Sequence, residues 1–437
     1  MTTPRRILFV CMQHSPHACR WINALVDRGW DLHLFPMNYE PALPTLQGVT
    51  LHRPFLRVRR EQLLRVPRGT PARWWDGLVA AEVAAHPHRL PQAPVYPLPL
   101  TISAEAALNR LQRRTGESDA TSPLFYGPRT LARVIRRLKP DLIHSMEFQH
   151  CGYNVLRARE LHGRGFPPWL ATNWGSDIYH YRHDPAHRAQ IKRLLSHLDF
   201  YSCECERDIG LARDLGMTAK ALPVMPNSGG FDLEACARIR AQVSPARRRS
   251  IMVKGYQHFA GRALTALAAL ERCADIVKDF EVVIFSPSTA AMQRADALRA
   301  TTPIKNITVV PYAPHDEMLR MHARARVYLG VSVSDAISTS ALEAMAMGAF
   351  PIQTDTSCCD EWFEPGRGGY LIPADDVDLI AQRVRSALTD DHLVDQAALL
   401  NWEVIASRLD QREMGRRIAA FYDRAFADLD QARGAEA

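Results

Sequence analysis

The sequence lacks the cysteine patterns of a metal-binding finger or a disulfide-rich fold. Its nine cysteines are scattered through 437 residues without a CxxC pair. The spacings Cys203–Cys205 and Cys358–Cys359 match no zinc site. We therefore expect reduced thiols, no metal site and a cytoplasmic protein, because an odd cysteine count without a disulfide framework is typical of reducing compartments.

Long apolar runs are also missing. No stretch of about 18 apolar residues occurs, so we expect no transmembrane helix. The apolar run from Ile7 to Met12 is too short for a signal-peptide core and predicts a strand. Composition is that of a soluble globular protein, with 47% hydrophobic and 23% charged residues. A chain of this length predicts two domains of roughly 200 residues each.

Lysine is scarce, so the net charge of +7 comes almost wholly from arginine. This surplus suits anionic partners such as nucleotide diphosphates or lipid phosphates. The absence of a basic helix with interleaved aromatic residues argues against nucleic acid. The segment Arg53–Arg68 alternates arginine with apolar residues. It predicts either an ordinary solvated helix or a peripheral contact with the inner face of a membrane.

Apolar strands alternate with amphipathic helices in two successive sets. The first set opens with a strand, a helix and a strand over residues 6–35, and its first turn carries no GxGxxG, which excludes a dinucleotide fingerprint. A Pro/Asn/Gly cluster at 223–230 is the best linker, and the pattern restarts at Ile251. We therefore predict an α/β protein with two Rossmann-like, doubly wound parallel sheets. Other expected strands are 140–145, 169–172, 199–203, 280–285, 307–310, 327–331, 350–353 and 369–372.

Two carboxylates separated by seven residues mark the second set. Asp335 lies in a loop after a strand, and Glu343 lies near the start of an apolar helix that ends at Gly348. This is the crevice where open α/β sheets bind ligands, and a helix start offers N–H groups to an anion. Alternatively, Ser340 and Glu343 form a capping box with a purely local role.

Other polar residues follow predicted strands. Lys254 ends one strand and Arg262 opens the next helix, so the two cations could bracket a diphosphate or could simply be surface charges. In the first set, His150 follows the strand that ends near His144, and Asp177 either orients a ligand or caps a helix. Gly175 would permit the close approach of a ligand. Further candidates for substrate contact are His14, His17, His144, Asn173 and Ser176.

The Asp335–Glu343 motif resembles the acidic-x7-acidic motif of GT-B glycosyltransferases, in particular retaining family 4. The family usually has glutamate at both ends and glycines after the first. This chain has aspartate and an Ala-Ile-Ser-Thr-Ser loop. The resemblance implies two domains that face a cleft: 1–228 on the acceptor side, 229–405 for the nucleotide sugar, and a helix at 406–437 that returns to the first domain.

The resemblance also implies roles for the candidate residues. Asp335 would hold hydroxyls of the donor sugar, and Glu343 would hold the ribose. Lys254 and Arg262 would neutralise the diphosphate, and His150 would contact the sugar from the opposite domain. Further nucleotide contacts are expected from Ser338, Thr339, Ser340 and Tyr312.

The expected activity is therefore that of a retaining, metal-independent transferase of the hexosyl type. Its donor would be a UDP- or GDP-type sugar, used as a substrate rather than a cofactor. Its acceptor would be a glycan or a lipid-linked molecule in bacterial surface polysaccharide or glycoconjugate synthesis. Two alternatives stay open at this point: a GT-B nucleotide-sugar epimerase, and a catalytically silent binding subunit. The altered acidic motif keeps the second one open.

Overall fold

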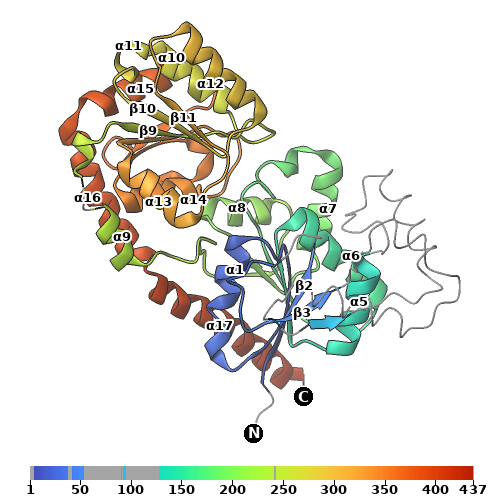
Figure 1. Ribbon diagram of the computed structural model, residues 1–437. Helices are drawn as coiled ribbons and strands as arrows, with labels where there is room; N and C mark the ends of the chain where they lie inside the picture. The colour runs from blue at the N-terminus through green and yellow to red at the C-terminus, as the bar shows by residue number, and fades with distance from the viewer. Residues whose placement is uncertain are drawn as a thin grey trace, which may run out of the picture.

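Two parallel sheets, each flanked by helices, make up the protein (Figure 1). The computed structural model describes residues 4–37, 42–53, 90, 92–94, 127–240 and 243–436. Most of the segment Arg53–Arg68 lies outside these ranges, so its expected membrane contact stays a prediction. Within the described ranges, no helix combines the length and the apolar character needed to cross a membrane.

Among the described residues, the first sheet has eight strands in the order β4-β3-β2-β1-β5-β6-β7-β8. The strand pairs are parallel, and buried apolar residues fill the central strands, as expected for a sheet covered on both faces. The strands are β1 Arg6–Cys11, β2 Asp31–Pro36, β3 Thr50–Arg53, β4 Gln92–Pro94, β5 Leu142–Met146, β6 Trp169–Thr172, β7 Phe200–Ser202 and β8 Lys220–Ala221.

Helices on this sheet begin and end at residues suited to those positions. Ser15 caps α1 by accepting a hydrogen bond from the Ala18 N–H, and Asp184 caps α7 in the same way. The helical elements are α1 Pro16–Asn23, η1 Val26–Arg28, α5 Gly127–Leu138, η3 Phe148–Gly152, α6 Tyr153–His162, η4 Tyr181–His183, α7 Pro185–Leu195 and α8 Glu206–Asp214.

The second sheet has six strands in the order β11-β10-β9-β12-β13-β14, again with parallel pairs. The strand order reverses direction between β9 and β12, so the carboxyl ends of these two strands form the switch-point crevice. The strands are β9 Ser250–Lys254, β10 Glu281–Phe285, β11 Ile307–Val310, β12 Val327–Gly330, β13 Phe350–Thr354 and β14 Tyr370–Ile372.

Apolar faces of the surrounding helices complete a core of aliphatic and aromatic side chains around this sheet. The helical elements are α9 Leu233–Arg240, η5 Pro245–Arg247, α10 Ala263–Arg272, α11 Ala274–Val277, α12 Thr289–Thr301, α13 His315–Arg324, α14 Thr339–Met347, η6 Asp355–Ser357, η7 Cys359–Glu361, α15 Val377–Thr389, α16 Asp391–Arg408 and α17 Gln411–Glu436.

The helix expected at 406–437 begins only at Gln411, because a separate helix, α16, ends at Arg408. The chain leaves the helical path at Leu409, whose carbonyl accepts a hydrogen bond from the Phe231 N–H at 2.7 Å. The Phe231 carbonyl then accepts from the Gln411 N–H at 2.9 Å. Asp410 caps the next helix through the Glu413 N–H. Phe231, which follows the linker, thus forms backbone hydrogen bonds with Leu409 and Gln411, and the helical region is divided here into α16 and α17.

Helix α17 leaves the second domain and runs along the first, beside α1 (Figure 1). Its residues Ile418, Phe421 and Tyr422 belong to the same buried cluster as Phe9 and Trp21. This apolar contact is what holds the returning helix on the first sheet. The predicted fold class, including the returning helix, is confirmed.

Candidate active site

Asp335 lies in the loop between β12 and α14, opposite the end of β9. Its Oδ2 is 3.5 Å from the Nζ of Lys254, and both side chains are largely buried. Burial alone would lower the pKa of Lys254, but attraction to Asp335, Tyr328 and Tyr256 outweighs it and raises the pKa. A charged ammonium group therefore faces the first carboxylate of the motif.

The start of α14 has no side-chain cap. Ser338 is its N-cap residue, but the Ser338 hydroxyl lies 3.2 Å from the hydroxyl of Tyr328. Thr339 and Ser340, in the first turn, are partly exposed. First-turn N–H groups lack partners within a helix, so this end of α14 is suited to an anion.

Glu343 does not form the capping box that was one interpretation of the motif. It is only 7% exposed, and its Oε1 accepts a hydrogen bond from His315 at 2.9 Å. His322 lies 3.8 Å from Oε2. Burial works to raise the pKa of Glu343, yet the His315 hydrogen bond and the charges of the two histidines and Arg20 lower it overall. The carboxylate is thus held ionised by the neighbouring helix α13, not by Ser340.

The first domain brings α1 toward these carboxylates. His17 is 3.1 Å from the carbonyl of Asn227, and Arg20 donates to the carbonyl of Ser228 at 2.9 Å. The pKa of His17 is lowered, mainly by burial and then by Arg20, although Glu343 and Asp335 act in the opposite direction. His17 therefore lies within electrostatic range of both acids. His14, in the same turn, is partly exposed.

The loop after β6 also approaches Asp335 from the first domain. The Ser334 hydroxyl donates to the Ser176 hydroxyl at 2.8 Å across the domains. A Cβ atom on Gly175 would lie 3.5 Å from the Asp335 Oδ1, and Gly175 has a φ of +36°. Glycine accommodates both this conformation and this approach.

Two other residues of this loop hold it in place instead of facing the cleft. Asn173 is fully buried and donates to Asp208 at 2.6 Å. Asp177 is also buried and accepts from the N–H groups of Phe148 and Trp174 at 2.9 and 2.8 Å. The Asp177 carboxylate is thus engaged within the first domain, whereas the Asn173 Oδ1 atom is buried without a hydrogen-bond partner. The predicted substrate contact of these two residues stays a prediction.

The two candidate histidines near β5 have opposite environments. His150 lies at the carboxyl edge of the first sheet, with 58% of its side chain exposed, and its Nδ1 is 3.0 Å from Glu147. His144 is completely buried. It lies between Tyr422 and Thr172, 2.6 Å from each hydroxyl, and burial lowers its pKa to about 3. The predicted substrate contact of His144 is therefore corrected: this residue joins α17 to the sheet.

The two cations of the second domain are not arranged as an equal pair. Lys254 faces Asp335, whereas the Arg262 guanidinium donates to the carbonyls of His258 and Gly261 at 2.8 and 2.9 Å. Tyr312, two residues after β11, is 84% exposed. The structure thus brings Lys254 to the acidic motif and places Arg262 and Tyr312 at more exposed positions around it.

Sequence families match both halves of the chain. Residues 112–202 match the family described as "Glycosyl transferase 4-like", and residues 252–390 match "Glycosyl transferases group 1". The chain is a GT-B glycosyltransferase. No curated protein matches the sequence.

Solved structures share the fold of this glycosyltransferase over nearly its whole length. Because the identities are low, these likenesses show the fold alone. Three examples are sucrose-phosphate synthase from Thermosynechococcus elongatus (15% identity, 97% of this chain and 100% of that chain, TM-score 0.64), alpha,alpha-trehalose 6-phosphate synthase from Burkholderia multivorans (14%, 100% and 100%, 0.63) and Anabaena HepE in complex with UDP (12%, 96% and 99%, 0.59).

Sequence reasoning missed two charged residues of the glycosyltransferase cleft that follow β7. Glu204 is buried and accepts from the N–H groups of Asn227 and Gly175 at 3.0 and 3.4 Å. Burial raises its pKa to about 8, and the negative charge of Asp335 adds to the effect. Arg207 donates to the carbonyls of Asp335 and Thr356, each at 2.8 Å. Their position at a strand end was the available signal.

Proposed function

We propose that this glycosyltransferase moves a hexosyl group from a UDP- or GDP-type sugar to a glycan or lipid-linked acceptor, with retention of anomeric configuration. The observation that carries the proposal is the Asp335–Lys254 pair, which lies beside the uncapped start of α14 and opposite Gly175. This arrangement places a cation and helix N–H groups where a diphosphate could bind. It also places a carboxylate beside them for sugar hydroxyls.

The donor side of the proposal is supported by the neighbouring structures. Anabaena HepE was solved in complex with UDP-glucose, with UDP, and with UDP and glucose. In this chain, Glu343 remains ionised and could accept hydrogen bonds from ribose hydroxyls. His315, with part of its side chain exposed, would share that carboxylate with the ribose.

In the proposed reaction, the bond between the anomeric carbon and the diphosphate oxygen breaks, and the diphosphate leaves with the electron pair. The acceptor hydroxyl oxygen forms the new bond to the same face of the sugar, and its proton passes to an oxygen of the departing diphosphate. Lys254 would stabilise the charge that develops on the leaving group. Asp335 and His150 would hold the sugar from the two domains while it becomes positively charged.

Nucleotide binding tests the site directly. We expect Lys254→Ala to weaken UDP or GDP binding at least tenfold, and Lys254→Ala combined with Arg262→Ala to weaken it further, because two cations would be lost. Isothermal titration calorimetry with UDP, GDP and ADP measures this. Arg272→Ala, an exposed arginine on α10, is the control. Unchanged affinity of the double variant would place the nucleotide elsewhere.

Product analysis separates transfer from the alternatives. The transferase should consume a donor sugar and join it to an acceptor, and NMR should show the anomer of the donor in the product. An isomerised nucleotide sugar formed without acceptor would indicate an epimerase. Binding without donor consumption under any acceptor would indicate a silent subunit, whereas an inverted product would contradict retention.

Catalysis is proposed to need no Mg²⁺ or Mn²⁺. Among the described residues, the group with donor atoms close enough for a metal contains two thiols, which are poor ligands for these hard cations. Adding Mg²⁺ or Mn²⁺ to chelator-treated protein should leave turnover within about twofold, because Lys254 and the α14 N-terminus neutralise the diphosphate. A large, Mn²⁺-dependent recovery of turnover would contradict this.

A further inference from the structure

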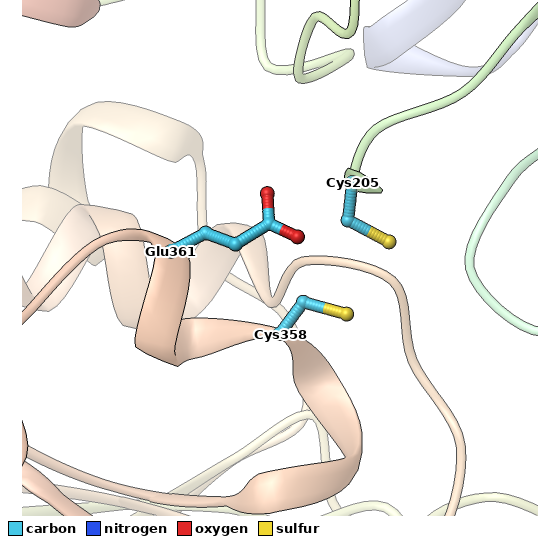
Figure 2. A group of neighbouring side chains, drawn as sticks. All are labelled: Cys205, Cys358 and Glu361. Atoms are coloured by element: carbon cyan, nitrogen blue, oxygen red, sulfur yellow. The ribbon is translucent and has the colours of Figure 1, made fainter. Parts of the chain in front are cut away.

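Two cysteines from different domains meet beside a glutamate. Cys205 follows β7 in the first domain, whereas Cys358 and Glu361 lie in the short helical segments after β13 in the second. One donor atom from each residue lies within 4.8 Å of the other two. Figure 2 shows the Glu361 carboxylate directed toward the space beside both thiols. The three side chains therefore form a compact S₂O set across the interface.

The dimensions of this set suit a small divalent cation. Metal–sulfur bonds of about 2.3 Å in a tetrahedral site place two sulfur atoms roughly 3.8 Å apart. Since the donor atoms already lie within 4.8 Å of one another, shifts of about 1 Å or less would complete the geometry. Cys358 is held at a φ of +47°, a conformation uncommon for a residue other than glycine.

Burial separates these thiols from ordinary surface cysteines. Cys205 is fully buried and Cys358 is 5% exposed, and both belong to one buried cluster with Ala336, the residue after Asp335. Both sulfur atoms are therefore sheltered from water, as in closed metal sites.

The surrounding charges and hydrogen bonds are compatible with a bound cation. Two thiolates, the Glu361 carboxylate and a divalent cation sum to one negative charge. Arg207, which also forms an ion pair with the buried Asp208 at 2.9 Å, lies within electrostatic range of both cysteines. One oxygen of Glu361 accepts from the Glu206 N–H at 3.0 Å, so the second oxygen can serve as the ligand.

We propose that Cys205, Cys358 and Glu361 bind one borderline-soft divalent cation of the Zn²⁺ type, with a water completing the tetrahedral coordination. Binding forms two metal–sulfur bonds and one metal–oxygen bond, and each thiol that binds releases its proton to solvent. The site is separate from the proposed nucleotide site and does not depend on the proposed function. Its physical effect is to join the two domains beside the loop that carries Asp335.

Cobalt absorption is the most direct test. We expect the reduced, chelator-treated full chain to bind one Co²⁺, with thiolate-to-metal charge-transfer bands and the visible bands of tetrahedral Co²⁺. Addition of Zn²⁺ should displace the Co²⁺. A weakly buffered solution should report up to two protons released per metal. Zn²⁺ should also raise the midpoint of thermal unfolding, since the folded chain brings the three ligands together and so binds the ion more tightly than the unfolded chain does.

Single substitutions assign the ligands. Cys205→Ala and Cys358→Ala should each abolish the charge-transfer bands and the Zn²⁺-dependent thermal shift, and Glu361→Gln should weaken Co²⁺ affinity at least tenfold. Cys359→Ala, which removes a buried cysteine next to the set, should retain both signals. Circular dichroism and unfolding without metal check that each variant folds.

The proposal fails if the wild-type chain shows no sulfur-to-metal bands at one equivalent of Co²⁺. It also fails if these bands persist in the folded Cys205→Ala or Cys358→Ala variant. Formation of a Cys205–Cys358 disulfide as the only reaction, seen by mass spectrometry, would likewise overturn the metal assignment in favour of a thiol pair.

Discussion

Three acids of the cleft, Glu343, Glu204 and Asp335, have different surroundings. Glu343 has its pKa lowered by His315, His322 and Arg20 against the effect of burial. Glu204 receives only backbone N–H groups, and burial raises its pKa to about 8. Asp335 is paired with Lys254. At the residue scale, the neighbouring histidines lower the pKa of Glu343, whereas Glu204, which has only backbone donors, has a raised pKa.

The turnover of variants tests the proposed contacts of Asp335 and His150 with the donor sugar. We expect Asp335→Ala and His150→Ala each to lower kcat about a hundredfold, the scale of a lost electrostatic or hydrogen-bond contribution to the transition state. Nucleotide affinity should change less than about threefold, because neither residue is proposed to contact the nucleotide. Steady-state kinetics and calorimetry measure both quantities.

The control for these variants is Asp360→Ala, which removes an exposed carboxylate of the second domain. It should keep normal kcat and affinity. Glu343→Ala should differ from Asp335→Ala by weakening donor binding as well. Near-normal kcat in both Asp335→Ala and His150→Ala would contradict the proposed mechanism and leave the fold assignment unaffected.

The Glu204 carboxyl should make stability depend on pH. Its pKa is about 8 in the folded chain against an ordinary value of 4.5, so between these values the folded state binds more protons than the unfolded state. This contribution to stability is therefore complete below pH 4.5 and is lost as the pH rises through about 8. Urea unfolding at several pH values should show the decline, and Glu204→Gln should reduce it. An equal decline in the variant would show that another group is responsible.

At the scale of elements, hydrogen bonds and apolar contacts fasten α17 to a sheet more than two hundred residues earlier in the chain. The Trp21 N–H donates to the Tyr422 hydroxyl at 2.8 Å. The Tyr422 hydroxyl and the Thr172 hydroxyl lie 2.6 Å from the two nitrogens of His144. The low pKa of His144 is consistent with a neutral imidazole. A neutral His144 completes this series of hydrogen bonds by accepting one from the Tyr422 hydroxyl and donating one to the Thr172 hydroxyl.

Removing one hydroxyl from this chain should cost measurable stability. Tyr422→Phe leaves the Trp21 N–H and one His144 nitrogen without a partner in a buried site. We expect a loss of about 1–3 kcal/mol in the free energy of unfolding. Chemical denaturation measures it, and Tyr312→Phe, at an exposed tyrosine, should cause no comparable loss. An unchanged free energy for Tyr422→Phe would show that the chain of hydrogen bonds contributes nothing net.

At the scale of the whole molecule, the first domain holds the loop that carries Asp335. Arg207 donates to the Asp335 carbonyl and to Thr356, and its guanidinium lies over the Tyr179 ring at 3.9 Å. Ser176 accepts from Ser334. Most of these contacts involve backbone, so they position the acidic loop without consuming its carboxylate.

Loss of the Arg207 contacts should lower activity and change the arrangement of the two domains. We expect Arg207→Ala to lower kcat/KM about tenfold or more, because the acidic loop loses its hydrogen bonds to the first domain. Arg213→Ala, an exposed arginine on the same helix α8, is the control. Steady-state kinetics and small-angle X-ray scattering would report activity and domain arrangement. Normal kcat/KM for Arg207→Ala would contradict a positioning role.

The sequence by itself determined the features that depend on local pattern. Apolar runs and turn residues predicted the strands at 6–11, 169–172 and 307–310 with little or no error, because strand burial repeats within a few residues. Asp335 and Glu343 lie within one short stretch between a strand and the next helix, so their spacing also indicated a crevice at a strand end. These local signals were sufficient for two parallel sheets and for the acidic motif.

Tertiary structure alone decided the partners of the buried polar groups. The sequence placed His144 near a strand end, but only the return of α17 shows that Tyr422 encloses it. Likewise, no spacing pairs Glu343 with His315, or Cys205 with Cys358. These partners come from elements that are distant in the chain, and hydrogen-bond geometry and burial exist only after the elements pack. For that reason the sequence predicted where polar side chains gather, and the folded chain determined which of them face the cleft.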